Sequence, residues 1–260
     1  YQFWRIYGFF DGLGKGETGL LSETVMSGDE LYSVGISDIE TADGIAFSNV
    51  MWLVNSEHML SEKDVPAVAT VDEKNSVSTY AFYDLQRLFA EVKSRFGKDL
   101  LLTSTYRTRE YQAWVYENNP YAVPAGTSEH ETGLAVDVKI DGYPQKRFIN
   151  SEVGRWIAKN SYKFGFIIRY PMWGEELTGV EYEPWHLRYV SEPHAEIIYR
   201  SKITLEEYAS LYEDGKFYSY GDYVISHQSG SERNLHFPDT DGNIYVSPDN
   251  AGGYYIWAKR

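Results

Sequence analysis

The most regular pattern of apolar and polar positions lies between residues 82 and 96. Apolar side chains recur there at three- and four-residue spacings: Phe82, Leu85, Leu88, Phe89, Val92 and Phe96. This spacing is typical of a helix with one buried face. Lys93 and Arg95 suit the end of a helix dipole, and Gly97 is a typical helix stop. The pattern predicts a helix that packs against a core.

Shorter patterns in the same central region alternate between strands and helices. We expect strands over residues 100–105, 134–140, 165–170 and 180–190, and helices over residues 109–117 and 153–164. Pro184 interrupts the last of these strands, and because proline cannot donate to a strand ladder, we expect irregular backbone there. An apolar run over residues 49–55 predicts a buried segment that leads into this region. The mixture predicts an α+β fold.

The two ends of the chain have a different character. Residues 1–45 mix aromatic, glycine and acidic residues without a sustained period, which predicts an extension with short strands at most. Residues 209–260 place tyrosine and tryptophan among glycine, serine and aspartate, which predicts a small β-rich appendage. Within it, Asp241-Gly242 is placed as a hairpin turn would be. We therefore expect an extension (1–45), a central domain (46–208) and an appendage (209–260).

Composition narrows the function classes. A chain of 260 residues can bury one good core with material left for a small addition. The net charge of −14 argues against nucleic acid and against an anionic membrane surface as partners. Without cysteine there is no disulfide framework, thiolate metal site or cysteine nucleophile. No apolar run is long enough to span a bilayer, and the start at Tyr1 rather than Met suggests that a signal peptide or membrane anchor has been left out.

The candidate chemistry lies in two motifs of the central domain. Ser128-Glu129-His130 is followed by Gly133 and Asp137, and Glu183-Pro184-Trp185-His186 comes some fifty residues later. Two histidines and an aspartate could bind Zn²⁺ and leave the fourth position open for water, as hydrolytic zinc sites do. Asp137 stands in an apolar strand, where metal ligation or a salt bridge would offset the cost of burying a carboxylate. These residues predict a zinc peptidase.

Two further residues could serve such a reaction. On a regular strand Glu183 and His186 would point to opposite faces, but a distortion at Pro184 could turn both toward one site. Glu183 would then be a proton acceptor beside the metal. Arg107 follows a predicted strand and could stabilise an oxyanion, or it could be an ordinary ion-pair residue. The remaining histidines are expected to be structural: His58, His194, His227 and His236.

Three segments together carry a resemblance to a known family. They are Ser-x-Tyr-Arg at 104–107 with Gln112, Ser-Glu-His-Glu-Thr-Gly-Leu-Ala-Val-Asp at 128–137, and Glu-Pro-Trp-His-Leu-Arg-Tyr-Val at 183–190. In this order they resemble the VanY-type D-alanyl-D-alanine carboxypeptidases of the LAS group of zinc peptidases. The resemblance covers roughly residues 49–208, and it implies a small antiparallel sheet with helices against one face.

The resemblance also implies roles for individual residues. His130, Asp137 and His186 would hold one zinc ion per chain, with Glu183 as the catalytic base and Arg107 on the oxyanion. Substrate contacts would come from a further set: Tyr106, Gln112, Ser128 and Trp185. Thr105 departs from the family, which often has a smaller residue there, and the short stretch 118–127 could leave a more open cleft.

The implied activity is removal of the terminal D-alanine from peptidoglycan stem peptides by metal-activated water. Two alternatives stay open: an L,D-carboxypeptidase that trims tetrapeptide stems, and a non-catalytic peptidoglycan-binding module. The stem peptide is the only partner that the sequence indicates, and the sequence does not fix an oligomeric state. The implied substrate predicts an extracytoplasmic protein, in the cell wall or anchored to the membrane.

Overall fold

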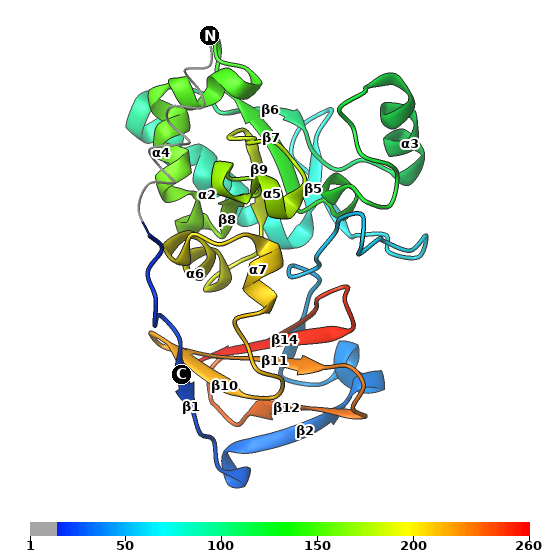
Figure 1. Ribbon diagram of the computed structural model, residues 1–260, viewed down its shortest axis with the longest axis vertical. Coiled ribbons are helices and arrows are strands. Elements are labelled where there is room, and N and C mark those ends of the chain that lie inside the picture. The colour runs from blue at the N-terminus through cyan, green and yellow to red at the C-terminus, as the bar shows by residue number, and fades with distance from the viewer. Residues whose placement is uncertain (1–14) are drawn as a thin grey trace. The chain divides into compact units, whose positions relative to one another are not determined.

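The structure, a computed structural model, describes residues 15–260. The first part of the predicted extension, residues 1–14, lies outside the described residues. The rest of the chain forms two compact units (Figure 1). The central unit contains residues 15–16 and 54–206, and the β unit contains residues 17–53 and 207–260.

The central unit is built on a four-stranded sheet in which every neighbouring pair is antiparallel. In spatial order its strands are β6 (Leu101–Ser104), β7 (Ala135–Lys139), β9 (His186–Tyr189) and β8 (Phe166–Ile168). A separate antiparallel pair is formed by β4 (Val68–Thr70) and β5 (Ser76–Ser78). The middle strands β7 and β9 carry Asp137 and His186, so the sheet itself brings two of the predicted ligands together.

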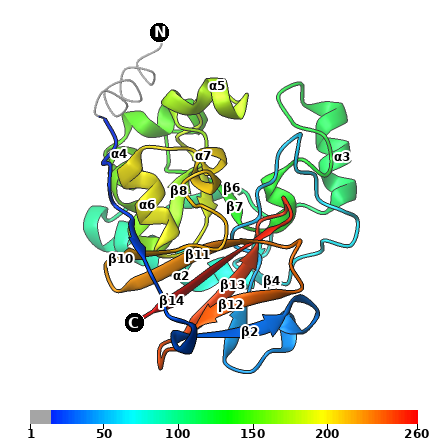
Figure 2. The ribbon, with the colours of Figure 1, turned by 60° about the horizontal axis from the view of Figure 1, so that its bottom comes forward.

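Helices surround this sheet. The α-helices of the central unit are α2 (Thr79–Phe96), α3 (Arg109–Asn118), α4 (Glu152–Asn160), α5 (Glu175–Thr178) and α6 (His194–Ser201), while α7 (Leu205–Ala209) contains the division between the units. Short 3-10 helices join them: η3 (Glu129–Thr132), η4 (Gln145–Asn150), η5 (Ser161–Phe164) and η6 (Met172–Gly174). In both views α3 stands apart from α4 and α6, with the sheet between them (Figures 1 and 2).

The predicted long helix is α2, and its limits have a local cause. The Ser78 side chain accepts a hydrogen bond from the backbone of Tyr80, which caps the first turn. Gly97 ends the helix in the left-handed conformation, with φ of 65°. Its buried stripe consists of Ala81, Leu85, Leu88 and Val92. The apolar period therefore predicted both the helix and its buried face.

The β unit is made from both ends of the described chain. Its six-stranded sheet has the order β1 (Ser22–Thr24), β10 (Phe217–Tyr220), β11 (Tyr223–Ser229), β14 (Gly253–Lys259), β13 (Ile244–Pro248) and β3 (Ile45–Phe47). Only β3 and β13 pair in parallel among these strands. A second sheet pairs β2 (Leu31–Gly35) with β12 (Asn234–Pro238), seen side by side in blue and orange in Figure 2. Two 3-10 helices flank β2: η1 (Gly28–Glu30) and η2 (Ile36–Thr41).

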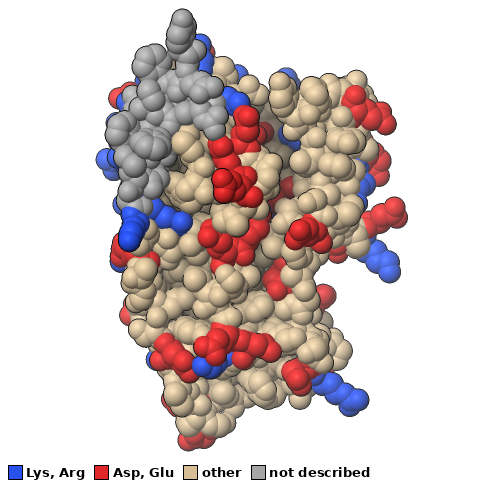
Figure 3. All heavy atoms as spheres, viewed as in Figure 1, with Lys and Arg blue, Asp and Glu red and all other residues tan. Residues whose placement is uncertain are grey.

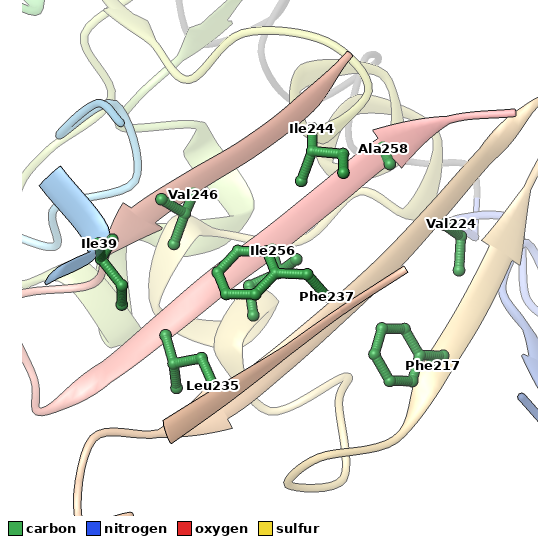
Figure 4. Close-up of a cluster of buried hydrophobic side chains, with 9 residues drawn as sticks. All are labelled: Ile39, Phe217, Val224, Leu235, Phe237, Ile244, Val246, Ile256 and Ala258. Carbon is green, nitrogen blue, oxygen red and sulfur yellow. The ribbon is translucent and has the colours of Figure 1, made fainter. Parts of the chain in front are cut away.

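One hydrophobic cluster fills the β unit (Figure 4). Phe237 and Leu235 come from the two-stranded sheet, Ile39 from η2, and the other members from the large sheet: Phe217, Val224, Ile244, Val246, Ile256 and Ala258. All are buried, and Phe237 and Leu235 are fully so. The cluster therefore joins residues from both ends of the chain in one core.

Three expectations differ from the structure. Residues 17–53 belong with residues 207–260, because β1, β2 and β3 pair with strands near the end of the chain. Asp241-Gly242 is not a hairpin turn, because the strands on either side, β12 and β13, pair in different sheets. The strand expected over residues 180–190 is wrong for its first part, since only β9 is a strand and the backbone turns at Pro184-Trp185. In the described part of the chain, no helix is both long and apolar enough to cross a membrane.

Candidate metal centre

Three side chains from separate segments meet at one end of the central sheet. His130 comes from η3, Asp137 from the middle of β7 and His186 from the first position of β9. Asp137 and His186 are direct cross-strand partners, which places both side chains on the same face of the sheet. The possible ligand atoms of all three residues lie within 4.8 Å of one another. The predicted ligand set is therefore assembled in the fold.

Gly133 makes this meeting possible. It has φ of 68° at the end of η3, and a Cβ atom there would lie 2.8 Å from the backbone nitrogen of Ser78. That same nitrogen donates a hydrogen bond to the Gly133 carbonyl. Only glycine satisfies both the left-handed backbone and the close approach. The chain can thus turn from His130 into the strand that carries Asp137.

The orientation of the His130 ring is set by Nδ1, the nitrogen that points away from Asp137. Nδ1 lies 2.9 Å from the carbonyl oxygen of Thr105, so Nε2 faces Asp137, with 3.4 Å between Nε2 and Oδ2. Burial lowers the pKa of His130, more than the neighbouring Asp137 raises it. The burial of His130 therefore favours the neutral ring, which is the form that binds a metal ion.

His186 faces Asp137 with Nδ1, whereas His130 faces it with Nε2. Its Nδ1 lies 2.9 Å from Oδ1 of Asp137. Burial disfavours the charged ring, but the hydrogen bond with Asp137 and the nearby carboxylate of Glu129 outweigh burial and raise the pKa of His186 to about 10. Several carboxylates thus converge on this ring, and the surroundings favour a positive charge here.

The donor set fits zinc. Two imidazole nitrogens and a carboxylate are ligands that Zn²⁺ takes in catalytic sites, with a fourth position left open. Bond lengths of about 2.0–2.1 Å place the ligand atoms of a tetrahedral ion about 3.3 Å apart. The distances in the structure are of this size: 3.4 Å from Nε2 of His130 to Oδ2 of Asp137, and 2.9 Å from Nδ1 of His186 to Oδ1 of Asp137.

Glu183 reaches the centre because the backbone turns before β9. The His186 backbone nitrogen donates to the Glu183 carbonyl at 3.0 Å, which closes a turn over Pro184-Trp185. Oε2 of Glu183 lies 3.9 Å from Nδ1 of His186, and its side chain is 28% exposed. Burial raises the pKa of Glu183 to about 7. A carboxylate with this pKa can both take up and release a proton near neutral pH.

Arg107 lies beside Asp137, with 4.0 Å between Nη2 and Oδ2. Its guanidinium donates to the Ser104 hydroxyl from Nε and Nη2, at 3.0 and 2.7 Å, and to Oε1 of Gln112 from Nη1 at 2.9 Å. Gln112 is fully buried, and its Nε2 donates to the Val123 carbonyl. Gln112 therefore braces Arg107, and the substrate contact expected of it stays a prediction.

The other expected substrate residues lie around the centre. Ser128 precedes η3, and Trp185 is in the turn before β9; both are buried. Tyr106 is half-buried between Thr105 and Arg107, where burial raises its pKa. Figure 3 shows the surface hollowed between α5 and α3, with acidic side chains gathered over α5. Substrate contacts of Ser128, Trp185 and Tyr106 stay predictions.

The sequence reading assigned no role to Glu129 or to the charged residues behind it. Glu129 is buried between Arg169 and Arg188, and Arg169 also binds Glu206. Burial alone would raise the pKa of Glu129, but the two guanidinium groups hold it well below its usual range. A signal was present, because Arg188 stands in an apolar strand two residues after His186 and needs a buried counter-ion.

Comparisons with known proteins agree with this geometry. Residues 74–192 match the family model described as VanY, D-alanyl-D-alanine carboxypeptidase. The chain is 34% identical over 215 residues to the putative carboxypeptidase YodJ of Bacillus subtilis (strain 168), which covers 72% of this chain and 78% of that protein. The chain belongs to the VanY family. This VanY-family chain is also 32% identical over 177 residues to the bifunctional D-Ala-D-Ala dipeptidase and carboxypeptidase VanXYC of Enterococcus gallinarum, covering 62% of this chain and 93% of the relative.

Solved structures place the VanY-family chain in the same fold. The D,D-dipeptidase VanXYg, in complex with a D-Ala-D-Ala phosphinate analogue, aligns with a TM-score of 0.73 at 21% identity, over 88% of this chain and 98% of its own. The aligned 88% of this chain is more than the central unit alone contains. At 21% identity the alignment shows a shared fold. A point mutant of a VanY D,D-pentapeptidase, in complex with Zn(II), aligns at 34% identity and a TM-score of 0.53, over 61% of this chain and 98% of its own. The LD-carboxypeptidase LdcB aligns at 33% identity and a TM-score of 0.56, over 66% of this chain and 93% of its own.

These findings confirm the expected fold class and enzyme class. The VanY-family chain is a carboxypeptidase of the zinc-peptidase type, with a central antiparallel sheet, flanking helices and a β-rich part that includes the end of the chain. His130, Asp137 and His186 form its candidate metal site. The reading as a non-catalytic binding module is not supported.

Proposed function

We propose that the protein is a zinc-dependent D,D-carboxypeptidase that removes the terminal D-alanine from peptidoglycan stem peptides. The observation that carries the proposal is the meeting of three ligand side chains, His130, Asp137 and His186, beside the carboxylate of Glu183. One zinc ion per chain would be held by these three residues. The relative VanXYC of Enterococcus gallinarum, a D-Ala-D-Ala dipeptidase and carboxypeptidase, supports the substrate class.

Bound zinc supplies a Lewis acid for the scissile carbonyl and lowers the pKa of a water molecule. Glu183 is placed to take the proton of the attacking water and to deliver it to the nitrogen of the departing D-alanine. Its pKa of about 7 suits both transfers. Its neighbours in the chain, Tyr182 and Trp185, are buried, and the Glu183 side chain is itself only 28% exposed.

Arg107 would donate to the oxyanion that forms as the carbonyl is attacked. Its guanidinium is held by Ser104 and Gln112, so it needs little reorganisation when charge develops. Asp137 lies 4.0 Å from the same guanidinium, which places Arg107 next to the candidate metal site. We propose that Ser128, Tyr106 and Trp185 line the path of the peptide.

L,D-carboxypeptidase activity is a second candidate function, because of one observation. The D,D-pentapeptidase and the LD-carboxypeptidase resemble this chain almost equally, at 34% and 33% identity with TM-scores of 0.53 and 0.56. This similarity does not distinguish cleavage of a D,D bond from cleavage of an L,D bond, so an L,D-carboxypeptidase acting on tetrapeptide stems is the alternative.

The test compares pentapeptide and tetrapeptide stems with the zinc-loaded protein, by mass spectrometry of the products. Loss of one alanine from the pentapeptide alone, abolished by a chelator, is the expected result. Loss from the tetrapeptide alone would assign the L,D activity, and cleavage of neither would contradict both. Because the proposed substrate lies outside the cytoplasmic membrane, we also propose an extracytoplasmic protein, which cell fractionation tests.

A further inference from the structure

Glu129 is a fully buried carboxylate beside the candidate metal centre. Its Oε1 accepts hydrogen bonds from Nε of Arg169 at 2.7 Å and from Nη1 of Arg188 at 2.6 Å. Both guanidinium groups are buried as completely as the carboxylate. Two rigid donors on one oxygen fix the plane of the carboxylate, so its second oxygen, Oε2, points in a set direction.

That direction leads to His186. Oε2 of Glu129 lies 3.6 Å from Nε2 of His186, slightly beyond hydrogen-bond distance. Within residues 15–260, both atoms are buried and neither has a hydrogen-bond partner. A buried donor and a buried acceptor that face each other in this way are costly unless they pair, and a small rotation of the imidazole would close the gap.

We propose that Glu129 is a positioning residue of the metal centre, whose Oε2 accepts a hydrogen bond from Nε2–H of His186. A proton held on Nε2 leaves the lone pair of Nδ1 free for the metal, and Nδ1 is the nitrogen that faces Asp137. In His130 the two nitrogens exchange roles: Nδ1 pairs with the Thr105 carbonyl, and Nε2 faces Asp137. Histidine ligands commonly donate their outer N–H to a carboxylate or a carbonyl. The inference rests on the metal site proposed above and adds a residue to it.

The arginines make Glu129→Gln a sharp test. Arg169 and Arg188 can only donate, so they would hold the amide oxygen of the glutamine where Oε1 is now. The amide NH₂ would then face Nε2 of His186. A donor at this place favours the tautomer with its proton on Nδ1, and that nitrogen could no longer bind a metal.

Glu206→Gln is the matched control. Glu206 accepts from Nη1 of Arg169 at 2.9 Å, on the side away from Glu129, so the substitution weakens the same buried network and leaves Glu129 in place. We expect zinc affinity, measured by competition with a chromophoric chelator, to fall about 10- to 100-fold in Glu129→Gln. Glu206→Gln should stay close to the wild-type protein. Equal affinity in Glu129→Gln, or an equal loss in Glu206→Gln, would overturn the inference.

A second measurement needs no variant. Nitrogen NMR of the zinc-loaded wild-type protein, labelled in its histidines, should show the ring proton of His186 on Nε2 and that of His130 on Nδ1. A proton on Nδ1 of His186 would contradict the inference even if Glu129→Gln does not fold. Wild-type protein that binds no zinc would refute the metal site itself, whereas zinc binding that is insensitive to Glu129→Gln would refute only the role of Glu129.

Discussion

The imidazole rings of His130 and His186 stand edge to face, with their centroids 5.0 Å apart and their planes at 89°. One ring offers Nε2 and the other Nδ1 to the space beside Asp137. The two rings therefore differ in which nitrogen must keep a proton, and they need different outer acceptors: the carbonyl of Thr105 for His130 and, as we infer, the carboxylate of Glu129 for His186.

Glu183→Gln should separate metal binding from turnover. Glu183 is not one of the three clustered ligand residues, so the variant should bind zinc like the wild-type protein, while kcat falls about 10²- to 10⁴-fold with the loss of the proton acceptor. His186→Ala should lose both zinc and activity. Zinc content by mass spectrometry and the rate of D-alanine release check this. Substantial activity in Glu183→Gln would contradict the mechanism.

Arg107 and Gln112 should act as one unit. Arg107→Ala should lower kcat about 10²- to 10³-fold with zinc retained, because an oxyanion donor is lost. Gln112→Leu should cost about tenfold, the size of one hydrogen bond to a charged group, and nearly nothing more when Arg107 is already alanine. Steady-state kinetics of the three variants measure the coupling. Additive losses, or a rise in KM alone, would instead favour a direct substrate contact by Gln112.

Gly133→Ala should be more damaging than Gly142→Ala. Both glycines have positive φ, 68° and 78°, so each alanine should cost about 1–2 kcal/mol through its backbone. At Gly142 an added Cβ has open space, but at Gly133 it would meet the backbone of Ser78 at 2.8 Å. We expect a larger loss of unfolding free energy and weaker zinc binding for Gly133→Ala alone. Equal effects in urea melts and zinc titrations would show that the close approach is unimportant.

His194 should make the protein sensitive to acid. It is fully buried in α6, and burial lowers its pKa to about 3. As pH falls below about 6.5, the unfolded chain takes up the proton and the folded chain does not, so stability is lost. At pH 5 this loss is about 2 kcal/mol. His194→Gln should lose about 2 kcal/mol less than the wild-type protein between pH 7.5 and pH 5.

Urea melts at the two pH values measure this difference in unfolding free energy. His58→Gln is the control for the substitution itself, because His58 is only half-buried. The same loss in wild type and His194→Gln would show that another group causes the acid sensitivity.

The sequence predicted most of the central sheet and the clustered ligand residues, because these depend on local patterns and on long motifs. The run from Leu134 to Ile140 alternates as a strand does, and Asp137 stands out in it as a charged residue. The bracing of Arg107 by Gln112 was beyond such a reading, since the spacing does not show which way a buried amide points. The partner of Oε2 of Glu129 likewise depends on the fixed guanidinium groups of Arg169 and Arg188.

The β unit was harder to predict for a different reason. Residues 22–47 hold three short strands with no period of their own, and each strand is completed by a partner about two hundred residues away. Short strands of this kind are recognised by their pairing rather than by their side chains.

This long-range pairing has a consequence for synthesis on the ribosome. Strands β1, β2 and β3 are made before residues 54–206 of the central unit, whereas their partners β10, β12 and β13 are made after them. The central unit, which is continuous over residues 54–206, can be complete while those first strands still lack partners. The large sheet then has to close over a long intervening loop, which is intrinsically slow, and for that time its unpaired strand edges are exposed to other nascent chains.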